Sequence, residues 1–304
     1  MGIEYAVRRI NKNDRAMHNH VLSREKQKPT GSPFVIGLKR EEMVDLTIRN
    51  PYGRFRDGRP KVPESLLDEL RKMTCEDLWD GLYAAGYHHQ FDGDWITLCP
   101  EKKLIGRAVT AQFMPLRPDV DDRIQSRAAR FGLQCAPNQQ IIDSLEPYDV
   151  PVIDLFGKRE GGSFVGDILA TAIEVSTNTG LVVNGAVRDA GGIRTSKMPC
   201  YVRSVYPTPL HDVMLTGINI PIRIGMCTVM PGDIVLGDGE GVLFIPPETA
   251  HALVQRASKT ARQHIWVKQK LLSKKYKTSE LYPEPQTPEV KADCARFVKQ
   301  AGSE

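Results

Sequence analysis

The fold class is decided by residues 150–194, which read VPVIDLFGKREGGSFVGDILATAIEVSTNTGLVVNGAVRDAGGIR. The first seven of these residues form a short apolar run, which is typical of a buried strand. Residues 168–176 have apolar side chains at helical spacing, and residues 181–183 are again apolar and strand-like. A strand, a helix and a second strand therefore follow one another, which indicates an α/β fold.

The neighbouring segments extend this alternation. Residues 104–113 alternate like a half-buried strand, residues 115–147 hold charged and glutamine-rich helical sequence, and further strands are expected at 201–205 and 218–224. Residues 230–246 contain two apolar runs around GDGEG, which predicts a hairpin, and a helix should follow from about Pro247.

The two ends of the chain are expected to flank one core domain. Residues 1–60 are polar, basic and interrupted by Pro and Gly, which indicates an extension. Amphipathic helices are expected from Pro63 and from the N-cap candidate Thr74, the second ending near Gly86. After Tyr282 we expect a loop and a short helix. The predicted division is an extension over 1–61, a catalytic domain over 62–260 and a helical tail over 261–304.

The composition excludes several classes of protein. The chain has 304 residues, 41% of them hydrophobic, and a net charge of only +4 from 41 basic and 37 acidic residues. That balance gives no reason to expect a nucleic-acid partner, and the basic residues near the ends are interpreted as solvated faces. Six cysteines without a Cys-x-x-Cys pair indicate reduced thiols. With no apolar run of about 18 residues, we expect no membrane partner and a cytoplasmic location.

Candidate chemistry lies in the segment Gly166-Asp167-Ile168-Leu169 and in the pair Arg188-Asp189. A Gly-Asp turn entering a helix presents free backbone N–H groups to an anion such as a carboxylate. Aspartate oxygens suit Mg²⁺ or Mn²⁺, a guanidinium stabilises an enolate oxygen, and a second carboxylate positions a water. These roles predict a keto-acid lyase. The alternative is an Arg–Asp surface ion pair worth ~0 to 1 kcal/mol.

Residues 150–257 resemble the superfamily that joins the regulator of ribonuclease activity A with the 4-hydroxy-4-methyl-2-oxoglutarate aldolases. Asp167, twenty intervening residues and Arg188-Asp189 match its aldolase motif, Asp-x20-Arg-Asp. Three further segments resemble it: GLVVNGAVRDAGGIR, NIPIRIGMCTVMPGDIVLGDGEGVLFIP and, less closely, LIGRAVTAQF.

The resemblance implies a role for each motif residue. Asp189 would bind the divalent cation, Mg²⁺ or Mn²⁺, and Arg188 the keto oxygen of the substrate. Asp167 would act through a water, and the backbone of Gly166, Asp167, Ile168 and Leu169 would hold the substrate carboxylate. The implied reaction is retro-aldol cleavage of a 4-hydroxy-2-keto acid, or decarboxylation of oxaloacetate, with release of pyruvate.

The resemblance also implies a fold and an assembly. The fold would be a swivelling βαβ domain, and the assembly a homotrimer or homohexamer with sites between subunits. Residues 1–60 and the insert at 117–139 have no counterpart in the family, and Tyr148-Asp149 replaces its usual Gly-Asp. These departures leave the identity of the keto acid open.

Two other functions stay open, and three other polar pairs are assigned to structure. The chain could be a non-catalytic ribonuclease-binding regulator, or a dehydratase or isomerase of a sugar-acid derivative using the same site. His88-His89 is interpreted as a solvated pair, and His211-Asp212 is treated with similar caution. Asp238 and Glu240 are expected mainly to favour the hairpin turn.

Overall fold

The computed structural model describes residues 37–300, so expectations for residues 1–36 and 301–304 lie outside the described residues. The helices are α2 Arg40–Leu46, α3 Glu64–Leu70, α4 Cys75–Ala84, α5 Pro118–Arg130, α6 Pro137–Ile142, α7 Asp167–Thr177, α8 Ala190–Ser196, α9 Ala250–Leu272, α10 Thr278–Leu281 and α11 Pro288–Gln300, with a 3₁₀ turn at Pro247–Thr249. The strands are β1 Gly53–Arg54, β2 Pro60–Lys61, β3 Phe91–Asp92, β4 Ile96–Leu98, β5 Leu104–Pro115, β6 Asp149–Lys158, β7 Leu181–Val187, β8 Cys200–Val205, β9 Val213–Ile218, β10 Ile222–Ile224, β11 Cys227–Val229, β12 Ile234–Gly237 and β13 Val242–Ile245.

A mixed sheet of nine strands forms the centre of the fold. Its strand order is β3-β13-β12-β5-β6-β7-β8-β4, and β9 pairs with the last part of β5. Strands β5 to β8 run parallel, with Val152 opposite Val182 and Val182 opposite Tyr201, whereas the outer strands are antiparallel. The expected α/β class is confirmed, and the parallel centre places the ends of β6 and β7 at the same edge of the sheet.

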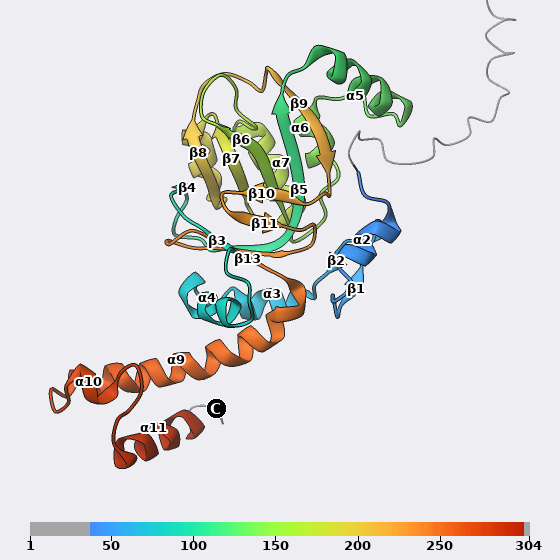
Figure 1. The fold of residues 1–304 in the computed structure, drawn as a ribbon. Helices are drawn as coiled ribbons and strands as arrows, with labels where there is room; N and C mark the ends of the chain where they lie inside the picture. Colours follow the sequence, from blue (N-terminus) through green and yellow to red (C-terminus); the bar gives the residue numbers. More distant parts are fainter. Residues whose placement is uncertain (1–36, 301–304) are drawn as a thin grey trace, which may run out of the picture. The chain divides into compact units, whose positions relative to one another are not determined.

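Apolar layers cover both faces of the parallel strands (Figure 1). On one face, α6, α7 and α8 pack against side chains such as Ile153 and Val183. On the other face, the β10–β11 hairpin packs against side chains such as Val152 and Val182. A separate core joins α3, α4 and α9 to β12 and β13. The parallel strands are therefore buried on both faces, as is usual in this type of sheet.

Two local expectations need correction, and a third is confirmed. Residues 104–113 do form a strand, but β5 is buried on both faces rather than half-buried, because apolar layers pack on both sides of it. The single strand expected at 218–224 is two strands, β9 and β10. Asn219 between them has φ of 52°, and Pro221 has no N–H to donate to a ladder. The hairpin expected at 230–246 is confirmed as β12–β13, in which Gly237 lies opposite Val242.

The part of the predicted N-terminal extension that the structure describes is ordered against the core. Residues 40–61 contain α2 and the β1–β2 hairpin, which the sequence did not predict. Arg59 donates from Nη1 and Nη2 to the two carboxylate oxygens of Asp149, at 2.8 and 3.0 Å. Arg107 Nε lies 3.7 Å from the same carboxylate, and the Phe55 ring covers Arg59. The extension is thereby tied to the first residue of β6.

The C-terminal segment forms helices, as expected after residue 250. Helix α9 is followed by α10 and by α11, which packs back along it (Figure 1). Trp266 and Cys294 belong to the small core between these helices. Within residues 37–300, no helix is both long enough and apolar enough to cross a membrane.

Candidate active site

The pair Arg188-Asp189 stands between β7 and α8. Asp189 takes the left-handed conformation, with φ of 53°, which Asp tolerates better than most residues. Its carbonyl accepts a hydrogen bond from Ile193 N at 3.1 Å, so the chain turns directly from the strand into the helix. Strand β7 thus delivers both side chains to the edge where the parallel strands end.

The segment Gly166-Asp167 begins α7 at the same edge. Phe164 N donates to Ala186 O at 2.8 Å, and Arg188 N donates to Val165 O at 2.9 Å. These two bonds fasten the loop before α7 to the end of β7. Asp167 is therefore held beside Arg188-Asp189, although twenty residues separate them in the chain.

Two glycines allow this close approach. A Cβ at Gly166 would overlap the Asp189 carboxylate and lie 2.9 Å from Arg188 Nε, while a Cβ at Gly192 would lie 2.6 Å from Asp167 Cβ. The glycine-rich sequence around Arg188 predicts such an approach, and it occurs at Gly192. A Cβ at Gly191, by contrast, would have no atom within 4 Å.

The charged side chains of the site are partly accessible to solvent. Arg188 Nε lies 3.4 Å from Asp189 Oδ2, and the two side chains are 36% and 51% exposed. Asp167 Oδ1 accepts a hydrogen bond from Ile168 N at 2.8 Å. The carboxylates of Asp167 and Asp189 are thus present as open oxygen donors on either side of the glycine contacts.

A small cavity of about 40 Å³ lies next to this cluster. It is lined by Gly166, Leu169 and Arg188 together with residues of α6 and of two loops, including Asn138, Ser163 and Leu210. Its volume suits a group of a few atoms, such as a carboxylate, rather than a whole metabolite. The first-turn amides of α7 at this position have no intrahelical acceptors. Ile168 is 80% exposed, so only its backbone could belong to the predicted carboxylate-binding segment 166–169. Its N–H already donates a hydrogen bond to Asp167.

A family model described as RraA-like, Aldolase/RraA, matches residues 75–244 of the chain. The chain belongs to the RraA-like family. Its structure is similar to that of RraAS2 from Streptomyces coelicolor, described as an unusual member of the RNase ES inhibitor RraA family. That match has a TM-score of 0.59 and 22% identity, and it covers 72% of this chain and 99% of that one. A structure from Pseudomonas syringae pv. tomato matches with a TM-score of 0.61 and 20% identity, covering 76% and 96%.

Two sequence relatives carry informative names. A protein of Halalkalibacterium halodurans named "Putative 4-hydroxy-4-methyl-2-oxoglutarate aldolase" is 27% identical over 167 residues, which are 54% of this chain and 78% of that protein. Protein DlpA of Legionella pneumophila is 28% identical over 196 residues, which are 63% of this chain but only 29% of DlpA. The RraA-like region is thus shared with proteins of quite different length.

The donor set of this RraA-like site fits a hydrated Mg²⁺ or Mn²⁺. In residues 37–300, no group of three or more His, Cys, Asp or Glu side chains is arranged to enclose a metal ion. A hard cation that keeps most of its waters needs only one or two protein carboxylates, whereas structural zinc needs four ligands. Asp189 is a half-exposed carboxylate that would hold the cation, and Asp167 lies in the same cluster, against Gly192 of α8.

The remaining polar pairs have structural partners. The exposed His88 stacks on Tyr83, with ring centroids 4.4 Å apart, and His211 Nδ1 pairs with Asp212 at 2.8 Å on the surface. Asp238 accepts from Glu240 N at 2.9 Å, which supports the expected turn role. It also accepts from Cys75 N at 2.8 Å, and so caps α4.

One contributor to the site had no signal in the sequence. Asn138 of α6 donates from Nδ2 to Phe164 O at 2.8 Å and lines the small cavity. It lies within the insert at 117–139, whose role could not be predicted from the sequence. Its position depends on how α6 packs beside α7, a contact between residues distant in the chain.

Proposed function

We propose that this RraA-like protein is a divalent-metal-dependent lyase that releases pyruvate from a small 2-keto acid. The observation that carries the proposal is the joining of Asp167 to Arg188 and Asp189 through the Gly166 and Gly192 contacts. The names of two relatives as aldolases, in Halalkalibacterium halodurans and Shewanella oneidensis, support the same reaction class.

Each residue has a defined task in this proposal. The substrate carboxylate lies at the first turn of α7, beside Gly166 and Leu169, where free amides favour an anion. Arg188, which lines the small cavity, donates to the keto oxygen and stabilises the negative charge that develops there. Asp189 holds the cation. When bound, the cation polarises the keto group as a Lewis acid.

The bond changes are those of a retro-aldol cleavage. A base removes the proton of the 4-hydroxyl group, and the 4-oxygen forms a carbonyl group at C4 as the bond between C3 and C4 breaks. The C4 fragment leaves as a carbonyl compound, and the electrons of the broken bond form an enolate whose oxygen faces Arg188. A water positioned by Asp167 transfers protons, and protonation at C3 completes pyruvate. With oxaloacetate, loss of CO₂ gives the same enolate, so the site would also support decarboxylation.

We further propose that subunits assemble as a homotrimer or homohexamer with the site at an interface. Ile168 and Val175, on the outer face of α7, are 80% and 81% exposed, and Ile168 directly follows Asp167. Apolar side chains beside a polar site are typical of a surface that another chain covers. Light scattering after size exclusion should give a trimer or hexamer; a monomer at micromolar concentration would contradict this part.

The test is a coupled pyruvate assay over 4-hydroxy-2-keto acids and oxaloacetate, with Mg²⁺ or Mn²⁺. We expect pyruvate release with at least one substrate, its loss after EDTA treatment, and recovery when metal is returned. Full activity after EDTA would contradict the metal role. No pyruvate from any substrate, together with capture of a ribonuclease, would favour the regulator; a keto acid consumed without pyruvate would favour dehydration or isomerisation.

A further inference from the structure

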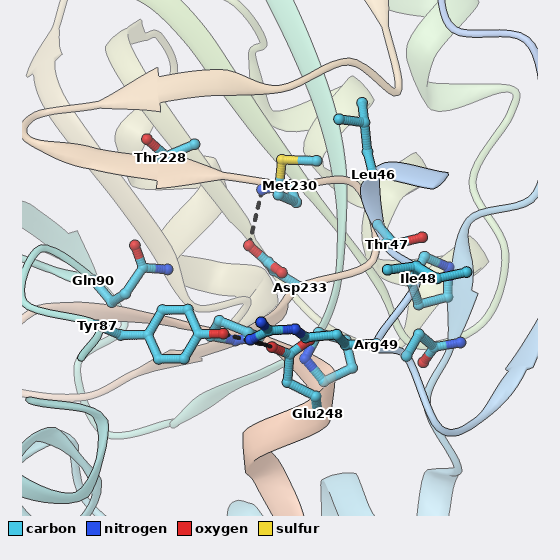
Figure 2. A pocket seen from close by; sticks show the side chains of 14 residues that line it. Leu46, Thr47, Ile48, Arg49, Tyr87, Gln90, Thr228, Met230, Asp233 and Glu248 are labelled. Carbon is cyan, nitrogen blue, oxygen red and sulfur yellow. Dashed lines mark hydrogen bonds and ion pairs between the residues drawn. The ribbon is translucent and has the colours of Figure 1, made fainter. Parts of the chain in front are cut away.

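A larger cavity, of about 390 Å³, lies elsewhere in the protein (Figure 2). Its walls come from the end of α2 and the following loop, from the turn between β11 and β12, and from the segment after β13. No residue that lines this cavity also lines the small cavity at Gly166. Its volume falls in the range of sites for small organic molecules, roughly 300 to 1,000 Å³.

Asp233 is the buried charged group of this cavity. Its residue surface is only 3% exposed, and its Oδ2 accepts a hydrogen bond from Met230 N at 2.8 Å. The other carboxylate oxygen has no hydrogen-bond partner among residues 37–300, and the side chain lines the cavity (Figure 2). Because Asp233 lines the cavity and this oxygen is not among the fully buried unsatisfied atoms of residues 37–300, a donor that enters the cavity can reach it.

Glu248 adds a second carboxylate to the same wall. Tyr87 OH donates to Glu248 Oε1 at 2.5 Å, and Arg49 Nη1 lies 3.6 Å from that oxygen. The Arg49 side chain is 78% exposed, so its charge at the rim is well solvated. The groups that carry or can change charge on this cavity are Arg49, Tyr87, Asp233 and Glu248. Two carboxylates against one solvated guanidinium favour a positively charged ligand.

The rest of the lining is largely apolar, with four uncharged polar residues among it: Thr47, Asn50, Gln90 and Thr228. Pro60, Met230 and Pro246 contribute hydrocarbon surface beside the two carboxylates, and Leu46 and Ile48 lie at the α2 side. No third His, Cys, Asp or Glu joins Asp233 and Glu248 to enclose a metal ion within residues 37–300. The mixture of two acids and apolar walls suits an ammonium group with a short hydrocarbon part better than a bare cation.

We propose that this cavity is a second ligand site that binds a small organic cation, with its ammonium group between Asp233 and Glu248. The free oxygen of Asp233 accepts one N–H, and Glu248 accepts another. The hydrocarbon part packs on Met230 and Pro246. This site is separate from the proposed lyase chemistry and does not depend on it.

The binding of simple probes at two pH values tests the ligand class. Butylammonium, butyrate and 1-butanol have the same chain and differ in charge, and saturation-transfer NMR or calorimetry reports their affinities. We expect butylammonium to bind and the other two not to bind measurably at pH 8. Burial, and then the charge of Glu248, raises the pKa of Asp233 to about 7. Affinity should therefore fall about tenfold at pH 6, where Asp233 takes up a proton.

Isosteric variants test the residues. Asp233→Asn retains an oxygen for Met230 N but loses the charge, and it should weaken butylammonium binding by at least about tenfold. Glu248→Gln tests the same site should Asp233→Asn fail to fold. Asp68→Asn is the control, because Asp68 is an exposed acid that pairs with Arg71.

Three results would overturn the proposal. These are tighter binding of butyrate than of butylammonium, no binding of any of the three probes, or equal butylammonium affinity in the wild type, Asp233→Asn and Glu248→Gln. Asp189→Ala should keep butylammonium binding while pyruvate release is lost. The butylammonium measurements therefore test the second site even if the protein releases no pyruvate.

Discussion

Two Arg–Asp pairs in this protein have the same chemistry and opposite surroundings. Arg59 and Asp149 are 4% and 0% exposed and form two hydrogen bonds, although they are 90 positions apart in the chain. Arg188 and Asp189 are neighbours in the chain, lie 3.4 Å apart and are 36% and 51% exposed. In the first pair both carboxylate oxygens accept a hydrogen bond from Arg59, and both side chains are buried, so the pair stabilises the fold. The second has free oxygens and N–H groups that a substrate and a cation can use.

The strongest way to break this comparison is to remove Asp149. Asp149→Ala removes the buried carboxylate that Arg59 and Arg107 share, which should cost about 3 to 5 kcal/mol of unfolding free energy. Urea unfolding measures the effect. Asp119→Ala removes the exposed partner of Arg117, and it should change the unfolding free energy far less. A similar loss in both variants would show that burial does not distinguish the pairs.

The converse test is Arg188→Ala. Loss of one donor to a developing oxyanion lowers kcat by roughly 10² to 10³, equivalent to about 2.7 to 4 kcal/mol. The unfolding free energy should change by less than about 1 kcal/mol, because the pair is solvated. Pyruvate release and urea unfolding on the same preparation check both parts. A large loss of stability would place Arg188-Asp189 with the structural pair.

Asp233 extends the comparison of the two pairs, because it is a buried aspartate, like Asp149, but forms no ion pair with an arginine within residues 37–300. Burial raises its pKa from 3.8 to about 7, so the folded protein keeps a proton that the unfolded chain releases. Its contribution to stability is present below about pH 4 and is lost as pH rises to about 7, with a slope of up to about 1.4 kcal/mol per pH unit. Asp233→Asn should flatten this part of the stability–pH curve. An unchanged curve, measured by urea unfolding from pH 4 to 8, would contradict the assignment.

The smallest expected effect concerns the glycine contacts that bring Asp167 close to the open pair Arg188-Asp189. A Cβ in Gly192→Ala would meet Asp167 Cβ at 2.6 Å and push α8 from α7, which should lower kcat about tenfold. Gly191→Ala, one residue away in the same helix, meets nothing within 4 Å and is the matched control. Equal kcat values for the two variants would show that the spacing of Asp167 and Asp189 does not matter.

Much of the core architecture could be predicted because it is written in local patterns. The apolar runs that became β6 and β7 and the helical spacing of α7 are properties of short segments, and they appear where expected. The break between β9 and β10 was missed, because the strand-like alternation of isoleucines over 218–224 does not show that Asn219 turns the chain. The prediction that β5 is half-buried was also wrong, since an alternating pattern alone does not show that other elements cover both faces of the strand.

The sequence by itself determined the family motif, the α/β class and the residues with suitable chemistry, because residue type and spacing are local quantities. Only the tertiary structure decided which charges are sealed and which are open. The buried pair at Asp149 and the cap that Asp238 makes on α4 depend on partners far along the chain, and the burial of Asp233 depends on remote segments that line its cavity. Burial and distance between remote segments set the local dielectric and the available hydrogen bonds, and these decide what an acidic side chain does.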